Sequence, residues 1–88
     1  MIFKKIKQIL RIAKYEKKLN KAKELLSSGK SGKELKKLVS ELEAYYLGPL
    51  WKSDYADDEA GLLPKSLKRG VLSQDEIYNI LEIFGENE

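Results

Sequence analysis

The sequence predicts an all-α protein: an antiparallel helical hairpin, then a wrapped irregular segment, then a short C-terminal helix. Three observations predict this class. Apolar residues recur at helical spacing in three stretches, glycine and proline stand where such stretches end, and nowhere do apolar and polar residues alternate as they do in a half-buried strand. With 88 residues, 42% of them hydrophobic and 35% charged, the chain suits a single small helical domain spanning residues 1–88.

The first helix is expected over residues 2–27, and it carries two apolar stripes. The early stripe falls at positions 2, 6, 9, 10 and 13, and the later one at positions 12, 15, 19, 22 and 26. Since each residue of a helix turns by about 100°, the two stripes point roughly 140° apart. Two interpretations remain open. The helix bends or has neighbours on two sides, or residues 1–11 form a basic amphipathic arm outside the domain core.

A second helix is expected over residues 33–47, after a polar break. Gly29 suits the end of the first helix, and Ser31 or Gly32 suits the start of the second. The second helix should stop at residue 47 because a Gly-Pro pair follows. So short a connection predicts that the two helices pack antiparallel. The apolar stripe of the second helix comprises Leu35, Leu38, Val39, Leu42, Tyr45 and Tyr46.

Residues 48–72 are expected to wrap across the hairpin in short turns. One helical turn would end at Gly61, and another would run from Pro64 to Gly70. The side chains expected to close the core from this segment are Trp51, Leu62, Leu63, Leu67, Val71 and Leu72.

A capping box formed by Ser73 and Glu76 predicts a final helix over residues 74–84. Its buried stripe is expected to comprise Ile77, Ile80, Leu81 and Phe84.

The residue types that are missing argue against an enzyme. The chain has no cysteine and no histidine, so it cannot form a disulfide, a Ser-His or Cys-His nucleophile pair, or an ordinary zinc site. Residues 29–31 spell Gly-Lys-Ser, but a phosphate loop needs a glycine where Glu24 stands. We therefore expect no enzymatic activity, no cofactor and no metal.

Charge is divided unevenly along the chain. Residues 1–37 hold thirteen basic against three acidic side chains, and residues 38–88 hold four basic against eleven acidic ones. One interpretation is that the halves neutralise each other within the fold or across a homodimer. The other is an arm that binds phosphates of nucleic acid or of an anionic membrane, without specificity because lysine dominates arginine. The candidate anion-binding residues are Lys4, Lys5, Lys7, Arg11, Lys14 and Lys18.

Four acidic residues cluster at positions 54, 57, 58 and 59, close to the only tryptophan. Ala56 interrupts the ligand pattern of a calcium loop. Helix capping and ion pairing explain the cluster most simply, with Lys65, Lys68, Arg69 or the first helix as partners. The alternative is an acidic and aromatic surface for a protein partner, since tryptophan, tyrosine and arginine carry much of the energy of interfaces. Its candidate residues are Trp51, Asp54, Tyr55, Asp57, Asp58, Glu59, Lys68 and Arg69.

The stretch from Leu42 to Leu81 carries a long motif. It holds a Tyr-Tyr pair at positions 45–46, Trp-x-x-Asp-Tyr at 51–55, and Asp-Glu-Ala-Gly-x-Leu-Pro-x-x-Leu-Lys-Arg-Gly-Val-Leu-Ser-x-Asp at 58–75. In these residues the chain resembles a small bacterial family of uncharacterised proteins. The resemblance implies a helical hairpin followed by this signature, in a family of unknown function.

The sequence favours a non-enzymatic protein-binding module, a small adaptor or inhibitor whose size also suits a regulator carried by a phage or mobile element. No apolar run is long enough to span a membrane, so we expect a cytoplasmic protein. The partner is expected to be another protein. The alternative is a charge-driven binder of nucleic acid or of an anionic membrane, acting through the lysine-rich N-terminal helix.

Overall fold

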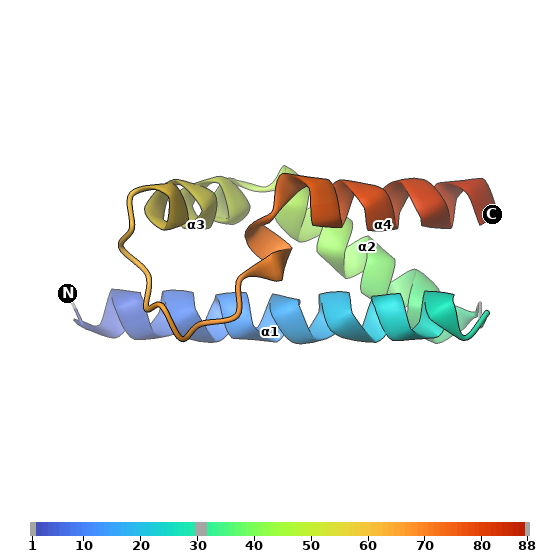
Figure 1. The fold of residues 1–88 in the computed structure, drawn as a ribbon, viewed down its shortest axis with the longest axis horizontal. Coiled ribbons are helices and arrows are strands. Elements are labelled where there is room, and N and C mark those ends of the chain that lie inside the picture. Colours follow the sequence, from blue (N-terminus) through green and yellow to red (C-terminus); the bar gives the residue numbers. More distant parts are fainter. Residues whose placement is uncertain (1, 30–31, 88) are drawn as a thin grey trace.

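A computed structural model of the protein describes residues 2–29 and 32–87 and confirms the all-α class. The elements follow in the order α1 (Ile2–Ser27), α2 (Lys33–Leu47), α3 (Pro49–Glu59), the 3-10 turn η1 (Gly70–Leu72) and α4 (Gln74–Asn87), with no strand among the described residues. The molecule measures 42 × 18 × 16 Å. Helix α1 is about 39 Å long, at about 1.5 Å per residue, and runs along the whole long dimension (Figure 1).

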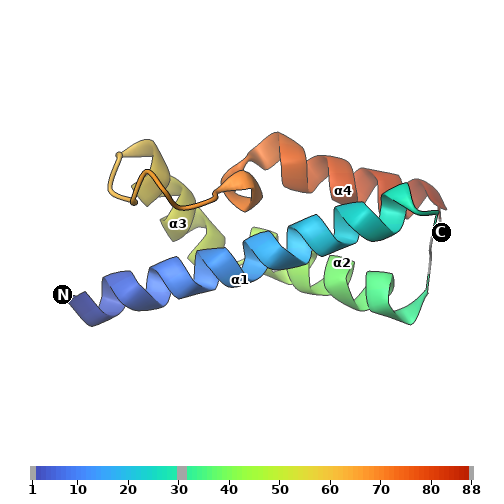
Figure 2. The same ribbon diagram turned by 60° about the horizontal axis from the view of Figure 1, so that its bottom comes forward.

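Helices α1 and α2 form the expected antiparallel hairpin (Figure 2). Gly29 ends the first helix with φ of 70°, a backbone conformation that glycine adopts without strain, and its amide donates to the carbonyl of Leu26 at 3.1 Å. Gly32 is the N-cap of α2. The prediction that Ser31 could serve there lies outside the described residues, as does Lys30 of the Gly-Lys-Ser sequence.

Helix α3 is longer than the sequence suggested. The expectation of a single turn ending at Gly61 was wrong, because α3 is an 11-residue helix whose first residue is Pro49. Proline suits that place, where its missing amide hydrogen would have no partner and its fixed φ already matches the helix. Gly48, in an extended conformation, supplies the break between α2 and α3. The helical turn expected from Pro64 to Gly70 is absent, and the chain there runs as loop and turn before η1.

The predicted cap of α4 is present in part. The amide of Glu76 donates to the hydroxyl of Ser73 at 3.4 Å, as in a capping box. The carboxylate of Glu76 pairs with Lys23 on α1, so this ion pair draws it toward the hairpin. Helix α4 continues to Asn87, three residues beyond the predicted end.

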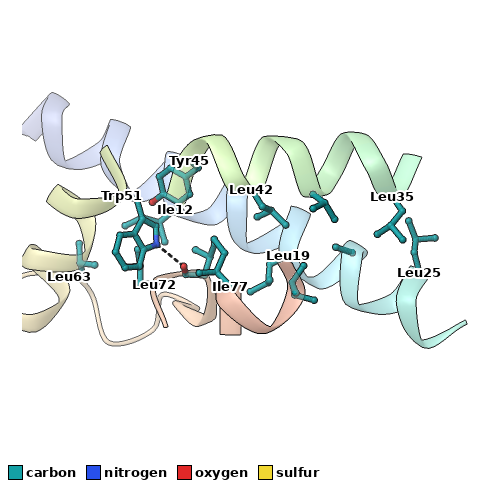
Figure 3. Close-up of a cluster of buried hydrophobic side chains, with 14 residues drawn as sticks. Ile12, Leu19, Leu25, Leu35, Leu42, Tyr45, Trp51, Leu63, Leu72 and Ile77 are labelled. Carbon is teal, nitrogen blue, oxygen red and sulfur yellow. Dashed lines mark hydrogen bonds between the residues drawn. The ribbon is translucent and has the colours of Figure 1, made fainter. Parts of the chain in front are cut away.

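The core lies between α1, α2 and the segment that carries η1 and α4 (Figure 3). From the wrapped segment, Trp51, Leu63, Val71 and Leu72 are buried as predicted, Leu67 is half-buried, and Leu62 is 58% exposed. The other buried apolar residues are Ile12, Leu19, Ala22, Leu25, Leu35, Val39, Leu42, Tyr45, Ile77 and Ile80.

The two stripes of α1 have different environments. The later stripe faces the core, where Ile12, Leu19 and Ala22 are fully buried. In the early stripe Ile6, Leu10 and Ala13 are exposed and Ile9 is half-buried, yet α1 is continuous through both stripes. The first residues of α1 therefore belong to the same helix as the core residues. None of the helices in the described residues has a stretch both long and apolar enough to cross a bilayer.

Candidate functional site

A buried carboxylate, that of Asp54, joins three helices. Its Oδ1 accepts hydrogen bonds from Arg11 Nη2 at 2.6 Å and Gln8 Nε2 at 3.1 Å. Its Oδ2 accepts from Arg11 Nε at 2.9 Å and from the hydroxyl of Tyr45 at 2.5 Å. Gln8 and Arg11 come from α1, Tyr45 from α2 and Asp54 from α3. We call these four residues the polar junction.

Electrostatics keep the polar junction charged. Burial alone would raise the pKa of Asp54, but hydrogen bonds from Arg11, Tyr45 and Gln8 outweigh burial, so the pKa lies below its usual value. The hydrogen bond to Asp54 raises the pKa of Arg11, against the opposing effect of burial. Burial, followed by the hydrogen bond to Asp54, raises the pKa of the Tyr45 phenol. At neutral pH the junction holds a carboxylate, a guanidinium and a neutral phenol.

The polar junction is suited to holding helices together and not to chemistry. Asp54 is fully buried, and its two oxygens accept four hydrogen bonds, which is about all that a carboxylate can accept. It has no lone pair left for a metal or a substrate proton. Across the described residues, no group of three or more potential metal ligands occurs and no buried polar side-chain atom lacks a hydrogen-bond partner.

The other acids of the cluster also have internal partners. Asp57 accepts a hydrogen bond from Gln8 Nε2 at 2.8 Å and lies 3.9 Å from the ammonium of Lys5. Asp58 accepts from Arg69 Nη1 at 2.7 Å. Ion pairing with the first helix and with Arg69 therefore accounts for Asp54, Asp57 and Asp58, as the simpler interpretation of the sequence held.

Trp51 lies inside the molecule and not on a partner surface. It is 7% exposed, and its Nε1 donates to the carbonyl of Val71 at 3.0 Å (Figure 3). Its ring stacks on Tyr55 with centroids 5.1 Å apart. Tyr46 meets the same ring edge-on at 4.8 Å. Burial removes Trp51 and Asp54 from the predicted surface, because neither can touch a partner in this conformation.

The remaining predicted partner residues fall into separate places. Tyr55, Asp58, Glu59 and Arg69 line one shallow pocket of about 360 Å³ beside the start of α4. The negative charge of Glu59 raises the pKa of Tyr55 there. Asp57 faces α1, and Lys68 lines a different groove.

The predicted anion-binding residues are likewise divided. Lys4, Lys5, Lys7 and Arg11 line a pocket of about 380 Å³ with Ser53 and Asp57, but Arg11 and Lys5 are engaged by Asp54 and Asp57. Lys14 and Lys18 line another groove, where Lys18 pairs with Glu41 at 3.1 Å. The six residues do not form a single basic surface.

An exposed apolar row runs along the face of α1 that points away from the core. Phe3 is 75% exposed, Ile6 46% and Leu10 64%, and the exposed Ala13 continues the row. We call these four residues the outer seam. Their spacing of three and four residues keeps them on one face of the helix. The outer seam ends beside a groove of about 840 Å³ that Leu10 and Ala13 share with Leu67 and Lys68.

Three side chains that make polar contacts within the fold were not singled out for them from the sequence. Gln8 stands four residues before Ile12, so extending the buried stripe toward the N-terminus would have placed it inside. Tyr45 was expected only as a core residue. Glu16 accepts the amide of Val71 at 2.8 Å across 55 positions, a contact for which the sequence holds no local signal.

Comparison with known proteins agrees with the resemblance at the level of the family. The model of a family described as "Domain of unknown function (DUF4298)" matches residues 3–86. No curated protein and no solved structure matches the chain.

Proposed function

The chain belongs to the DUF4298 family of domains of unknown function, and we propose that it is a non-enzymatic protein-binding module, a small cytoplasmic adaptor or inhibitor that docks through the outer seam of α1. The observation that carries this proposal is the exposure of Phe3, Ile6 and Leu10 in one row. The proposed surface thus differs from the acidic and aromatic one expected from the sequence.

The spacing of the row fits a known mode of protein recognition. Phe3, Ile6 and Leu10 stand at i, i+3 and i+7, the positions by which an amphipathic helix presents its apolar face to a partner. Single exposed apolar residues are ordinary, but a contiguous row on one helix face marks an interaction surface in many soluble proteins.

The fold itself does not need the outer seam. The opposite face of α1 supplies the core contacts through Ile12, Leu19 and Ala22, and the polar junction holds the N-terminal half through Gln8 and Arg11. Polar residues at the exposed seam positions would leave those contacts in place.

Photocrosslinking in living cells tests the location of the docking face. A photoreactive benzoylphenylalanine replaces Ile6 in one variant and Tyr78 in a matched control, since Tyr78 is a comparably exposed apolar residue on α4. We expect a specific protein adduct from position 6 and none from position 78. An adduct from position 78 alone would move the interface to α4, and lipid or nucleic-acid adducts from position 6 would favour the charge-driven alternative.

A further inference from the structure

The outer seam has the pattern of one strand of a coiled coil. Phe3, Ile6, Leu10 and Ala13 alternate steps of three and four residues, which is the a and d spacing of a heptad repeat. Lys7 and Lys14 each follow an a position by four residues, so they line one edge of the seam at e positions. A helix that packs against this seam would meet apolar residues at its centre and ammonium groups along that edge.

The groove beside the seam is also basic. Its lining includes Lys14, Lys17 and Lys68, and no carboxylate of the described residues lies within ion-pairing distance of these three. The one acid of the groove, Glu16, is turned toward the loop, where it accepts the amide of Val71 at 2.8 Å and lies against Gly70. Within the part of the chain that the structure describes, these three ammonium groups therefore have no direct carboxylate partner.

We propose that the partner contributes an acidic amphipathic helix, which packs along the outer seam with carboxylates opposite Lys7 and Lys14. The inference rests on the proposed docking function and names the chemistry of what docks. Opposite charges at the edges of a helix pair set partner choice and orientation. From Phe3 to Asn20, seam and groove extend over about 25 Å of helix, room for about five turns of a partner helix at about 1.5 Å per residue.

Two other occupants fit this face less well. A second copy packed antiparallel through its own seam would place lysines at e positions opposite lysines, and like charges repel. A bilayer is flat and does not fill a groove between α1 and the loop carrying Leu67. A partner helix fills the groove and supplies the missing negative charge.

The test combines charge reversal with the crosslink at position 6. Lys7→Glu with Lys14→Glu should lower the crosslink yield roughly tenfold, since each reversal replaces an attraction by a repulsion. Lys33→Glu with Lys36→Glu is the matched control, because it changes the net charge equally on exposed residues of α2. The control should keep the yield of the unaltered protein.

Rescue identifies the class of partner. The crosslinked peptide should be acidic and amphipathic, and reversing its acidic residues to lysine should restore crosslinking to the Lys7→Glu, Lys14→Glu variant. An adduct at position 6 whose yield is indifferent to these reversals would overturn the acidic helix while leaving the docking proposal intact. No adduct at position 6 would overturn both. Crosslinking to a second copy, or binding of the purified protein to vesicles of phosphatidylglycerol and phosphatidylcholine that depends on Leu10, would also overturn the acidic helix.

Discussion

Arg11 and Asp54, 43 positions apart in the chain, are joined by two hydrogen bonds in the interior, from Nε to Oδ2 at 2.9 Å and from Nη2 to Oδ1 at 2.6 Å. Such a paired geometry holds a guanidinium and a carboxylate in one fixed orientation. Asp54 belongs to the Trp-x-x-Asp-Tyr part of the signature, and Trp51 and Tyr55 on either side of it also make interior contacts. Through Asp54, this part of the signature therefore fastens α3 to the hairpin.

Replacing Asp54 with Asn tests the polar junction. The side-chain amide of asparagine would place its own N–H donors against the N–H donors of Arg11 and Gln8. The substitution also leaves the partly buried guanidinium of Arg11 without its charge partner. We expect a loss of about 3 kcal/mol in the free energy of unfolding, the scale of a broken buried ion pair. Urea denaturation measures it.

Glu59→Gln is the control for that experiment, because Glu59 lies on the same helix but is exposed. It should change the free energy of unfolding by less than about 0.5 kcal/mol. Equal effects of the two substitutions would show that the junction is not a special source of stability.

Lowering the pH should reduce the stability of the fold, because Asp54 becomes protonated. Its pKa is lowered in the folded state by hydrogen bonds that outweigh burial, so its contribution is complete above the unfolded value of about 4 and is lost as the pH falls through the folded value. The difference in stability between the unaltered protein and Asp54→Asn should therefore be constant from neutral pH down to about 4 and shrink below it. Thermal melts across that range measure the difference, and a gap that widens in acid would contradict the assigned direction.

Fluorescence of the single tryptophan tests the placement of Trp51. Since the ring is buried and its Nε1 donates to Val71, we expect a blue-shifted emission, weak quenching by acrylamide and a red shift only on unfolding. Binding of a partner should leave this emission unchanged. Strong acrylamide quenching of the folded protein would show that Trp51 is exposed to solvent and would contradict its placement.

We expect Gly70 to tolerate a larger residue poorly because a Cβ would be crowded, and not because of the backbone conformation. A Cβ there would lie 3.2 and 3.3 Å from the two carboxylate oxygens of Glu16, which holds the amide of Val71. We expect Gly70→Ala to cost about 1 kcal/mol or more in the free energy of unfolding, on the scale of a lost hydrogen bond.

The matching double-mutant cycle uses Glu16→Ala. With Glu16 removed, Gly70→Ala should cost clearly less, because the crowded carboxylate is gone. Additive effects of the two substitutions in urea denaturation would show that Gly70 does not act through Glu16.

Local sequence patterns predicted the positions of three helices well and the length of the fourth poorly. The stripes located α1, α2 and α4, because the 3.6-residue period and the Gly-Pro break are properties of a few neighbouring residues. Helix α3 was underestimated since its 11 residues bury only Trp51 and Asp54, too few to form a visible stripe.

The site depended on contacts over long sequence distances. The acids at positions 54, 57 and 58 were recognised as needing partners, but only the fold brings Gln8 and Tyr45 to Asp54. Trp51 was expected in the core and also, from its residue type, on a partner surface. The structure agrees with the first expectation, since the ring is buried and the carbonyl of Val71 in η1 accepts its indole hydrogen. The two stripes of α1 do point in different directions, because Ile6 and Leu10 are exposed whereas Ile12 and Leu19 are buried.

The central claim is that a partner docks on the exposed outer seam, whereas the signature residues Trp51 and Asp54 lie inside the fold. Quantitative affinity purification from the cells that make the protein tests this claim most directly. One tagged variant carries Phe3→Ser with Leu10→Ser, and the control carries Tyr78→Ser with Ile83→Ser, which replaces exposed apolar residues of α4. Both should melt close to the unaltered protein, since all four side chains are exposed. We expect the first variant to lose the co-purifying partner and the second to retain it. Retention by the first variant together with loss by the second would contradict docking through the outer seam.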